Sequence, residues 1–153
     1  AWAELDKSAA TWSLPADRAK NANASQVPLS DLAVVELDAL AARSGRKTKD
    51  GWPRTGLVFS TTGKTSVSGH SRAKRRLDRE VAALAAKEKY QAEIAPWRLH
   101  DLRRTLATGM QRLGVRFEVT EAILNHVSGA KSGVAGVYQL HGWGPEKRNA
   151  LQS

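Results

Sequence analysis

One segment of the chain, residues 96–114, has helix signals at both ends and a repeating apolar side between them. Pro96 precedes the segment, Asp101 suits the positive first turn of a helix, and Gly114 stands where a left-handed residue ends many helices. Apolar residues recur along one side at helical spacing, so we expect that side to be buried. These residues are Leu102, Leu106, Met110 and Leu113. The fold must therefore provide other elements for this helix to pack against.

Length and charge narrow the classes of protein to consider. The 153 residues are the size of one domain, which we assign to residues 1–153, and 41% hydrophobic residues are enough for a modest core. A formal net charge of +9 favours a polyanionic partner, most commonly nucleic acid. The chain has no cysteine, which excludes disulfides, thiolate metal sites and a cysteine nucleophile. No apolar stretch approaches the ~20 residues that span a bilayer and no signal-peptide pattern opens the sequence, so we expect an intracellular protein without a membrane partner.

The N-terminal third predicts a β-hairpin followed by a helix. Residues 11–14 and 26–29 contain alternating apolar residues and flank a polar stretch, with Lys20 near the tip of the hairpin. Pro28 assigns the second strand to a sheet edge. Ser30 is a capping residue for a helix that reaches Arg43 and that Gly45 ends. The apolar residues predicted to face the core from this helix are Leu32, Val35 and Leu40.

The middle of the chain predicts a loop, a short strand and a long helix. Residues 45–56 are rich in charge and glycine and form the loop, and residues 57–59 form a short buried strand. An amphipathic helix runs from about Ser68 to Lys89. Its inward side consists of Ala73, Leu77, Val81 and Leu84, and its outward side of Arg72, Arg75, Arg76 and Arg79. The arginine side either lies along a phosphate backbone or is simply a solvated face.

The C-terminal third predicts three short helices. The first, roughly residues 119–125, has Val119, Ala122 and Ile123 on its apolar side and ends at His126. A glycine-rich stretch, residues 127–136, leads to a short helix that carries Tyr138, with Val134 and Val137 beside it. A last helix follows Pro145. Together these elements predict an α+β fold that is mainly α, with a small antiparallel sheet at one edge.

Four of these residues suggest a site for a phosphodiester. His100 and Arg103 are three positions apart, so on a helix they lie on one face and can address a common anion. His126 and Tyr138 follow in order, and a fold that gathers all four makes a metal-free site in which the tyrosine attacks phosphorus. Each residue also has a plainer interpretation. Tyr138 can be a packing residue, Arg103 a solvated charge, and His126 a helix C-terminal cap.

The motifs H-D-L-R-R-T at His100–Thr105, L-N-H at Leu124–His126 and V-Y at residues 137–138 resemble the C-terminal half of the catalytic domain of tyrosine recombinases, the phage integrase family. The stretch from Thr11 to Lys20, followed by V-P-L-S at residues 27–30, is similar to the lysine-bearing hairpin of that family. The resemblance extends from about Trp12 to Arg148 and keeps the family's order of motifs.

The resemblance implies a role for each matching residue. Tyr138 is the nucleophile, and its attack leaves a 3′-phosphotyrosyl bond and a free 5′-hydroxyl. Arg103 and His126 hold the non-bridging oxygens, Lys20 protonates the leaving 5′-oxygen, and His100 assists proton transfer at the tyrosine. No metal or cofactor is implied. Further contacts to DNA are expected from Arg72, Arg75, Arg76, Arg79 and Arg104.

The resemblance also implies that the chain is N-terminally truncated. The family has a further arginine on a helix before the lysine hairpin, nothing upstream of Lys20 matches it, and Arg18 lies on the wrong element. Since loss of one transition-state donor costs about 10²–10³ in rate, we expect weak activity or none from this chain alone. The alternative function is a non-catalytic DNA-binding module or remnant. A third possibility is a metal-independent ribonuclease that uses His100 and His126, and only the type of these residues supports it.

The same resemblance implies partners and origin. The partner is double-stranded DNA, and the full-length protein is expected to act as a homotetramer on paired sites in the cytoplasm of a bacterium, with a bacterial or phage origin. Residues 142–153 form a polar tail that, as in related proteins, is expected to dock on a neighbouring protomer.

Overall fold

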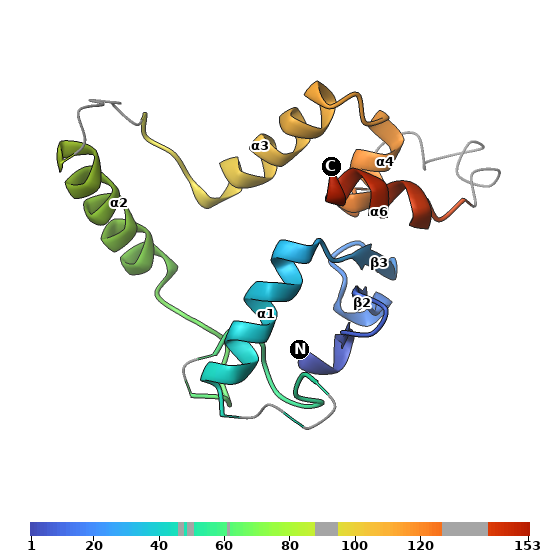
Figure 1. Ribbon diagram of the computed structural model, residues 1–153, viewed down its shortest axis with the longest axis horizontal. Coiled ribbons are helices and arrows are strands. Elements are labelled where there is room, and N and C mark those ends of the chain that lie inside the picture. Colours follow the sequence, from blue (N-terminus) through green and yellow to red (C-terminus); the bar gives the residue numbers. More distant parts are fainter. Residues whose placement is uncertain (46–47, 49–50, 61, 88–94, 127–140) are drawn as a thin grey trace.

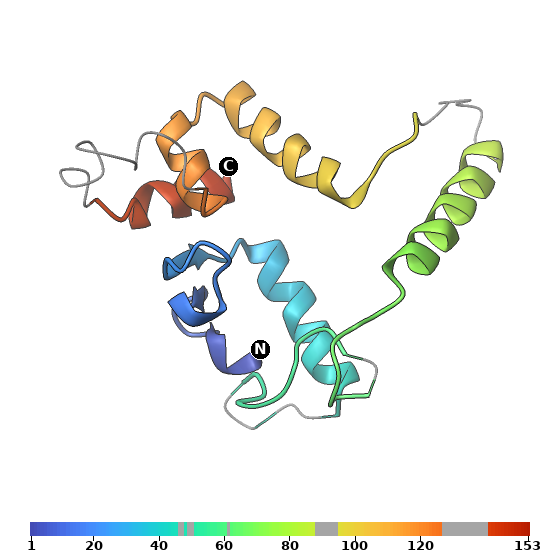
Figure 2. The ribbon, with the colours of Figure 1, turned by 180° about the vertical axis from the view of Figure 1, so that it is seen from behind.

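The computed structural model describes residues 1–45, 48, 51–60, 62–87, 95–126 and 141–153 (Figure 1). Within these ranges the chain is mainly helical with one small antiparallel sheet, which confirms the predicted α+β class. The sheet and helix α1 form one group, α4 and α6 form a second, and α3 extends from the second group toward α2 (Figures 1 and 2). None of the helices in the described ranges is long and apolar enough to cross a bilayer.

The sheet contains the predicted hairpin and one additional strand. Its order is β1 (Leu5–Asp6), β2 (Thr11–Leu14) and β3 (Ser25–Pro28), with both pairs antiparallel. Pro28 lies opposite Thr11 on the outer strand, which confirms the edge position predicted from the proline. The two-residue strand β1 was not predicted, because two residues are too few to establish a period.

Helix α6 (Gly144–Gln152) covers the free edge of β3. The Nζ atom of the buried Lys147 donates to the main-chain carbonyl of Gln26 at 2.8 Å, and an Arg148 Nη2 atom donates to the carbonyl of Ala9 at 3.1 Å. An edge carbonyl that would otherwise face solvent is thereby paired within the chain. The predicted helix after Pro145 is confirmed, and in this structure it packs on its own chain. Docking of residues 142–153 on a neighbouring protomer stays a prediction.

Helix α1 (Asp31–Arg43) begins and ends as predicted, but it buries a different side. Ser30 Oγ accepts from the Ala33 amide at 3.3 Å, and Gly45 has a φ of +64°. Leu32 and Val35 are 78% and 61% exposed, so their predicted burial is wrong. The buried residues are Leu37 and Ala41, with Leu40 and Val34 packed beside them. Burial follows the position of the two tryptophans that cover α1, which its own period does not fix.

The first hydrophobic core is built by Trp2, Leu37, Ala41 and Trp52, with the two tryptophan rings 6.2 Å apart between centroids. The predicted strand at residues 57–59 is wrong. Val58 packs against this core, but Phe59 is 67% exposed and the segment pairs with no strand among the described residues. Three apolar residues in a row were enough to suggest a strand, yet the segment joins no sheet in the described part of the chain.

The second hydrophobic core joins three helices. Met110 from α3 (Leu99–Arg112) packs with Val119 and Ile123 from α4 (Phe117–Ile123). Partly buried residues around them are Val115, Trp143, Ala150 and Leu151. The apolar side predicted for α4 is confirmed, since Val119, Ala122 and Ile123 are all buried.

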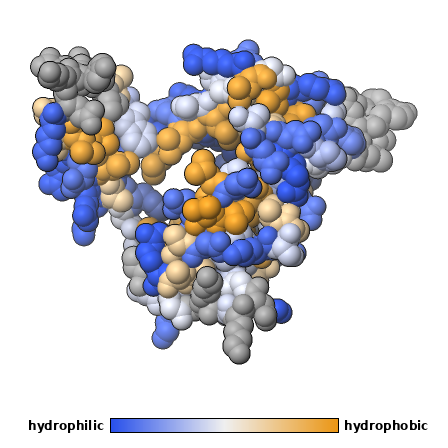
Figure 3. Space-filling view, viewed as in Figure 1, coloured by the Kyte–Doolittle hydropathy of each residue, from blue (hydrophilic) through white to orange (hydrophobic). Residues whose placement is uncertain are grey.

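Much of the predicted burial on α2 (His70–Lys87) and α3 is wrong. No residue of α2 is buried, and Leu77 and Leu84 are exposed, as are Leu102, Leu106 and Leu113. Figure 3 shows the resulting apolar surface over α1, α2 and α3. The C-terminal part of α3 packs on α4 and α6 through Met110, whereas Leu102 and Leu106, earlier on the apolar side of α3, are exposed.

Candidate active site

Arg103 joins α3 to the end of α4. Its side chain is half-buried, and its Nη2 atom donates to the main-chain carbonyl of Leu124 at 2.5 Å. One carbonyl engages only part of the five N–H donors of a guanidinium group. The contact thus fixes the arginine without using up its capacity to bind an anion.

The turn that delivers His126 is built by the C-terminal cap of α4. Asn125 has a φ of +49°, a left-handed conformation that asparagine tolerates better than most residues. The His126 amide donates to the Glu121 carbonyl at 2.9 Å, and the Asn125 amide donates to the Ala122 carbonyl at 3.3 Å. This pair of bonds is the Schellman arrangement that ends a helix. His126 therefore leaves α4 in a direction set by the backbone.

A carboxylate orients the His126 ring. The Nδ1 atom of His126 lies 3.1 Å from Glu121 Oε1, and the histidine side chain is 54% exposed. A histidine that uses Nδ1 on a carboxylate has Nε2 left for a ligand. Both predicted roles of His126 are compatible here, because its backbone closes the helix cap and its ring stays accessible.

The lysine-bearing turn of the hairpin lies against this histidine turn. Asn21 Nδ2 donates to the Asn125 carbonyl at 2.9 Å, and Asn125 Nδ2 lies 3.4 Å from both Asn21 Oδ1 and the Asn23 carbonyl. Lys20, exposed, immediately precedes Asn21. Two turns that are far apart in sequence are thus held side by side.

The structure gathers some of the predicted site residues. Arg103 contacts the segment that carries His126, and Lys20 stands next to the residue that binds this segment. His100 lies exposed in the first turn of α3 and makes no hydrogen bond to these three among the described residues. Tyr138 lies outside the described residues, as do the glycine-rich stretch and the short helix predicted around it, so the meeting of the phenol with the other groups stays a prediction.

Arg18, in the connection between β2 and β3, is engaged in an ion pair. Its Nη1 atom pairs with Glu4 Oε1, and Glu4 Oε2 accepts from Trp12 Nε1 at 3.2 Å. The guanidinium group is thereby held by a carboxylate on the N-terminal side of the sheet. This arrangement anchors the hairpin and occupies the arginine closest in sequence to Lys20.

Asp101 organises the first turn of α3, where His100 lies. Its Oδ2 atom accepts from the Arg98 main-chain amide at 2.8 Å, and its Oδ1 atom pairs with Arg104 at 3.3 Å. The backbone hydrogen bond, followed by the charges of Arg104 and His100, lowers the pKa of Asp101 below its usual range. Arg104 is exposed. The exposed arginines of α2 are Arg72, Arg75, Arg76 and Arg79.

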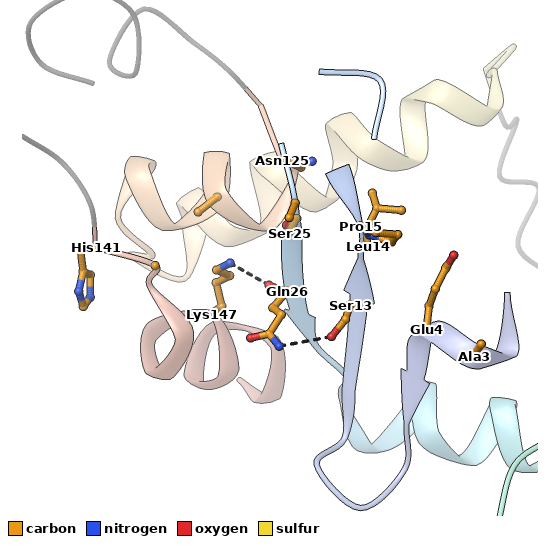
Figure 4. A pocket seen from close by; sticks show the side chains of 13 residues that line it. Ala3, Glu4, Ser13, Leu14, Pro15, Ser25, Gln26, Asn125, His141 and Lys147 are labelled. Carbon is orange, nitrogen blue, oxygen red and sulfur yellow. Dashed lines mark hydrogen bonds between the residues drawn. The ribbon is translucent and has the colours of Figure 1, made fainter. Parts of the chain in front are cut away.

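A pocket of about 710 Å³ lies beside the histidine turn (Figure 4). Residues of β2 and β3 line it together with Asn125, His141 and Lys147. Figure 4 shows Lys147 reaching toward the main chain of Gln26 across this space. No group of three or more histidine, aspartate and glutamate side chains within the described ranges is arranged to hold a metal ion.

Sequence reasoning missed three residues of this site. Glu121 and Asn125 had a local signal, because a helix that ends in asparagine predicts a left-handed cap and brings the residue four positions earlier close to the following side chain. Asn21 had none. Its partner Asn125 is 104 positions away, and no sequence pattern in either turn predicts the contact between them.

The chain matches the phage integrase family over residues 1–134, and it belongs to that family. Members are tyrosine recombinases, which bind DNA and act in site-specific recombination. The matched range contains Lys20, His100, Arg103 and His126 and stops before Tyr138. Neither a curated protein nor a solved structure matches the chain.

Proposed function

We propose that this chain is the C-terminal part of the catalytic domain of a site-specific DNA recombinase that cuts and rejoins strands through Tyr138. The observation that carries the proposal is the segment Leu124–His126. The carbonyl of its first residue accepts a hydrogen bond from Arg103, and the carbonyl of its second residue accepts one from Asn21 of the lysine turn. Its last residue is His126. This arrangement supports a site in which three cationic or proton-donating groups from distant parts of the sequence act together.

These groups suit phosphoryl transfer. In the proposed step the Tyr138 oxygen bonds to phosphorus, the bond from phosphorus to the 5′-oxygen breaks, and Lys20 gives a proton to that oxygen. Arg103 and His126 donate to the non-bridging oxygens, on which negative charge accumulates in the transition state. A free tyrosine has a pKa of ~10, so it needs neighbouring cations or a base to attack at neutral pH, and we assign that assistance to His100.

The covalent bond to tyrosine conserves the energy of the phosphodiester, so rejoining needs no nucleotide cofactor. The reverse step returns the phosphoryl group to a 5′-hydroxyl and frees the phenol. We further propose that the chain works on double-stranded DNA as part of a tetramer on paired sites. The exposed arginines of α2, with Arg104, are the proposed contacts to the phosphate backbone.

A second candidate function is a DNA-binding module that does not cut. One observation favours it: the Glu4 carboxylate holds Arg18, the arginine closest in sequence to Lys20. A site with one fewer guanidinium group binds phosphate with the remaining cations but stabilises the transition state less.

A nicked suicide substrate separates the two functions. We expect the wild-type chain to form a covalent protein–DNA adduct, Tyr138→Phe to form none, and Arg103→Ala to form it about 10²–10³ more slowly. The chain has two tyrosines, so Tyr90→Phe is the matched control and should retain the adduct. DNA binding without an adduct in the wild-type chain would favour the non-catalytic module.

A further inference from the structure

The hairpin that carries Lys20 is attached to the C-terminal half of the chain both at its strands and at its tip. At the strands, Lys147 of α6 holds the Gln26 carbonyl at 2.8 Å. At the tip, the two asparagine side chains contact each other and the opposite main chain: Asn21 Nδ2 reaches the Asn125 carbonyl at 2.9 Å, and Asn125 Nδ2 lies 3.4 Å from Asn21 Oδ1. The first attachment fixes the sheet. The second fixes the tip, where the lysine is.

The turn has an internal brace that prepares Asn21 for this contact. Asn21 Oδ1 accepts from the Asn23 amide at 3.1 Å, which holds the side chain over its own turn and leaves Nδ2 to face Asn125. On the other side, the left-handed backbone of Asn125 sets the direction of its carbonyl. Each asparagine is therefore oriented locally before the two turns meet.

We propose that Asn21 and Asn125 are positioning residues that hold Lys20 in register with Arg103 and His126. This inference rests on the proposed function, because it concerns the same site. Arg103 binds the Leu124 carbonyl and Asn21 binds the carbonyl of the next residue, so a movement of the lysine turn is a movement relative to both the arginine and the histidine. Removing the amide pair releases the tip of the hairpin while α6 retains the strands.

Amide hydrogen exchange tests the coupling without requiring catalysis. In Asn21→Ala we expect faster exchange in two places at once, residues 20–24 and residues 124–126. The matched control is Asn23→Ala, which keeps the Asn23 amide and carbonyl that the brace and the contact use. It should leave exchange at residues 124–126 unchanged. Faster exchange confined to residues 20–24 in Asn21→Ala would overturn the coupling.

A pair of suicide substrates tests the effect on Lys20. One has the natural 5′-bridging oxygen and the other a 5′-bridging sulfur, which leaves as a thiolate and needs no proton from the protein. Because misplacing a catalytic group by about 1 Å can cost 10²-fold in rate, we expect Asn21→Ala to slow oxygen cleavage by about 10–10²-fold and to cleave the sulfur substrate at the wild-type rate.

The outcomes are distinguishable. Equal slowing on both substrates would assign Asn21 a general structural role and overturn the positioning role, as would no slowing on either. If the wild-type chain forms no adduct with either substrate, the proposed function fails and with it the role toward Lys20, while the exchange experiment still decides whether the asparagine pair couples the two turns.

Discussion

At the scale of single residues, Asn125 joins three properties that seldom coincide. Its backbone is left-handed, its carbonyl accepts a hydrogen bond from a distant turn, and its side chain returns a contact to that turn. A left-handed φ costs most residues with a Cβ atom about 1–2 kcal/mol, and asparagine and glycine are the common exceptions. The residue before the candidate histidine is thus constrained by helix capping as well as by the site.

We expect Asn125→Ala to destabilise the fold more than Asn125→Gly does. Alanine bears the left-handed conformational cost of about 1–2 kcal/mol and also loses the side-chain contacts, whereas glycine loses the contacts and bears a smaller entropic cost of about 0.5–1 kcal/mol on folding. Urea unfolding of the two variants measures the difference in free energy of unfolding. Ala22, which has a φ of +54°, offers the converse control, since Ala22→Gly should not destabilise. Equal stability of Asn125→Ala and Asn125→Gly would contradict the capping role.

The sequence located individual residues better than it located their partners. An ordered set of motifs pointed to Lys20, Arg103 and His126, and in the structure Arg103 and the residue after Lys20 bind carbonyls of the two residues that precede His126. The hydrogen bonds that join these parts of the chain use main-chain carbonyls and amide side chains, which no sequence motif marks. A pair separated by 104 positions becomes visible only when the hairpin and α4 are packed together.

At the scale of elements, helix ends were predictable and helix burial was not. Ser30, Gly45 and Gly114 act locally, through hydrogen bonds or left-handed backbone within a few residues, so the sequence around them is sufficient. Periodicity identifies an apolar side but not the element that covers it. Leu102 and Leu32 lie on such sides and are exposed, because burial depends on packing against other parts of the chain, which the local period does not specify.

The first turn of α3 should respond to acid through Asp101. The pKa of this carboxyl is lowered in the folded chain, chiefly by the hydrogen bond from the Arg98 amide. A group with a lowered folded-state pKa contributes stability above its unfolded value of about 3.9, and that contribution is lost as the pH falls through the folded value. We expect Asp101→Asn to lower the Tm at pH 7 and the difference from wild type to shrink below pH ~4.

Thermal unfolding followed between pH 7 and acid checks this expectation. Asp17→Asn, on an exposed turn of the hairpin, is the matched control and should show a pH profile parallel to that of the wild type. A constant difference between Asp101→Asn and the wild type at every pH would mean that the aspartate acts through shape and not through charge.

At the scale of the whole molecule, the candidate site lies where two packed groups meet. The lysine turn belongs to the sheet that packs beside the tryptophan core, while Arg103 and His126 belong to helices around Met110. The connections between the groups include Lys147 to Gln26, Arg148 to Ala9, and the asparagine pair. All three are polar, so they set the geometry at the junction more than they add buried apolar area.

The arginines of α2 are proposed DNA contacts outside the candidate active site. The salt dependence of DNA affinity measures their role. α2 has no buried residue, so replacing Arg72, Arg75, Arg76 and Arg79 by glutamine should leave the free energy of unfolding nearly unchanged. Each arginine that neutralises a DNA phosphate contributes about 0.9 to the slope of log affinity against log salt concentration.

We therefore expect each single substitution that removes a phosphate contact to reduce this slope by about 1, nearly independently of DNA sequence, in titrations of duplex DNA from low to moderate salt. Arg54→Gln is the matched control, because Arg54 is an exposed arginine outside α2. An unchanged slope in the fourfold α2 variant would make that side a solvated face and confine DNA contacts to the region around Arg103 and His126.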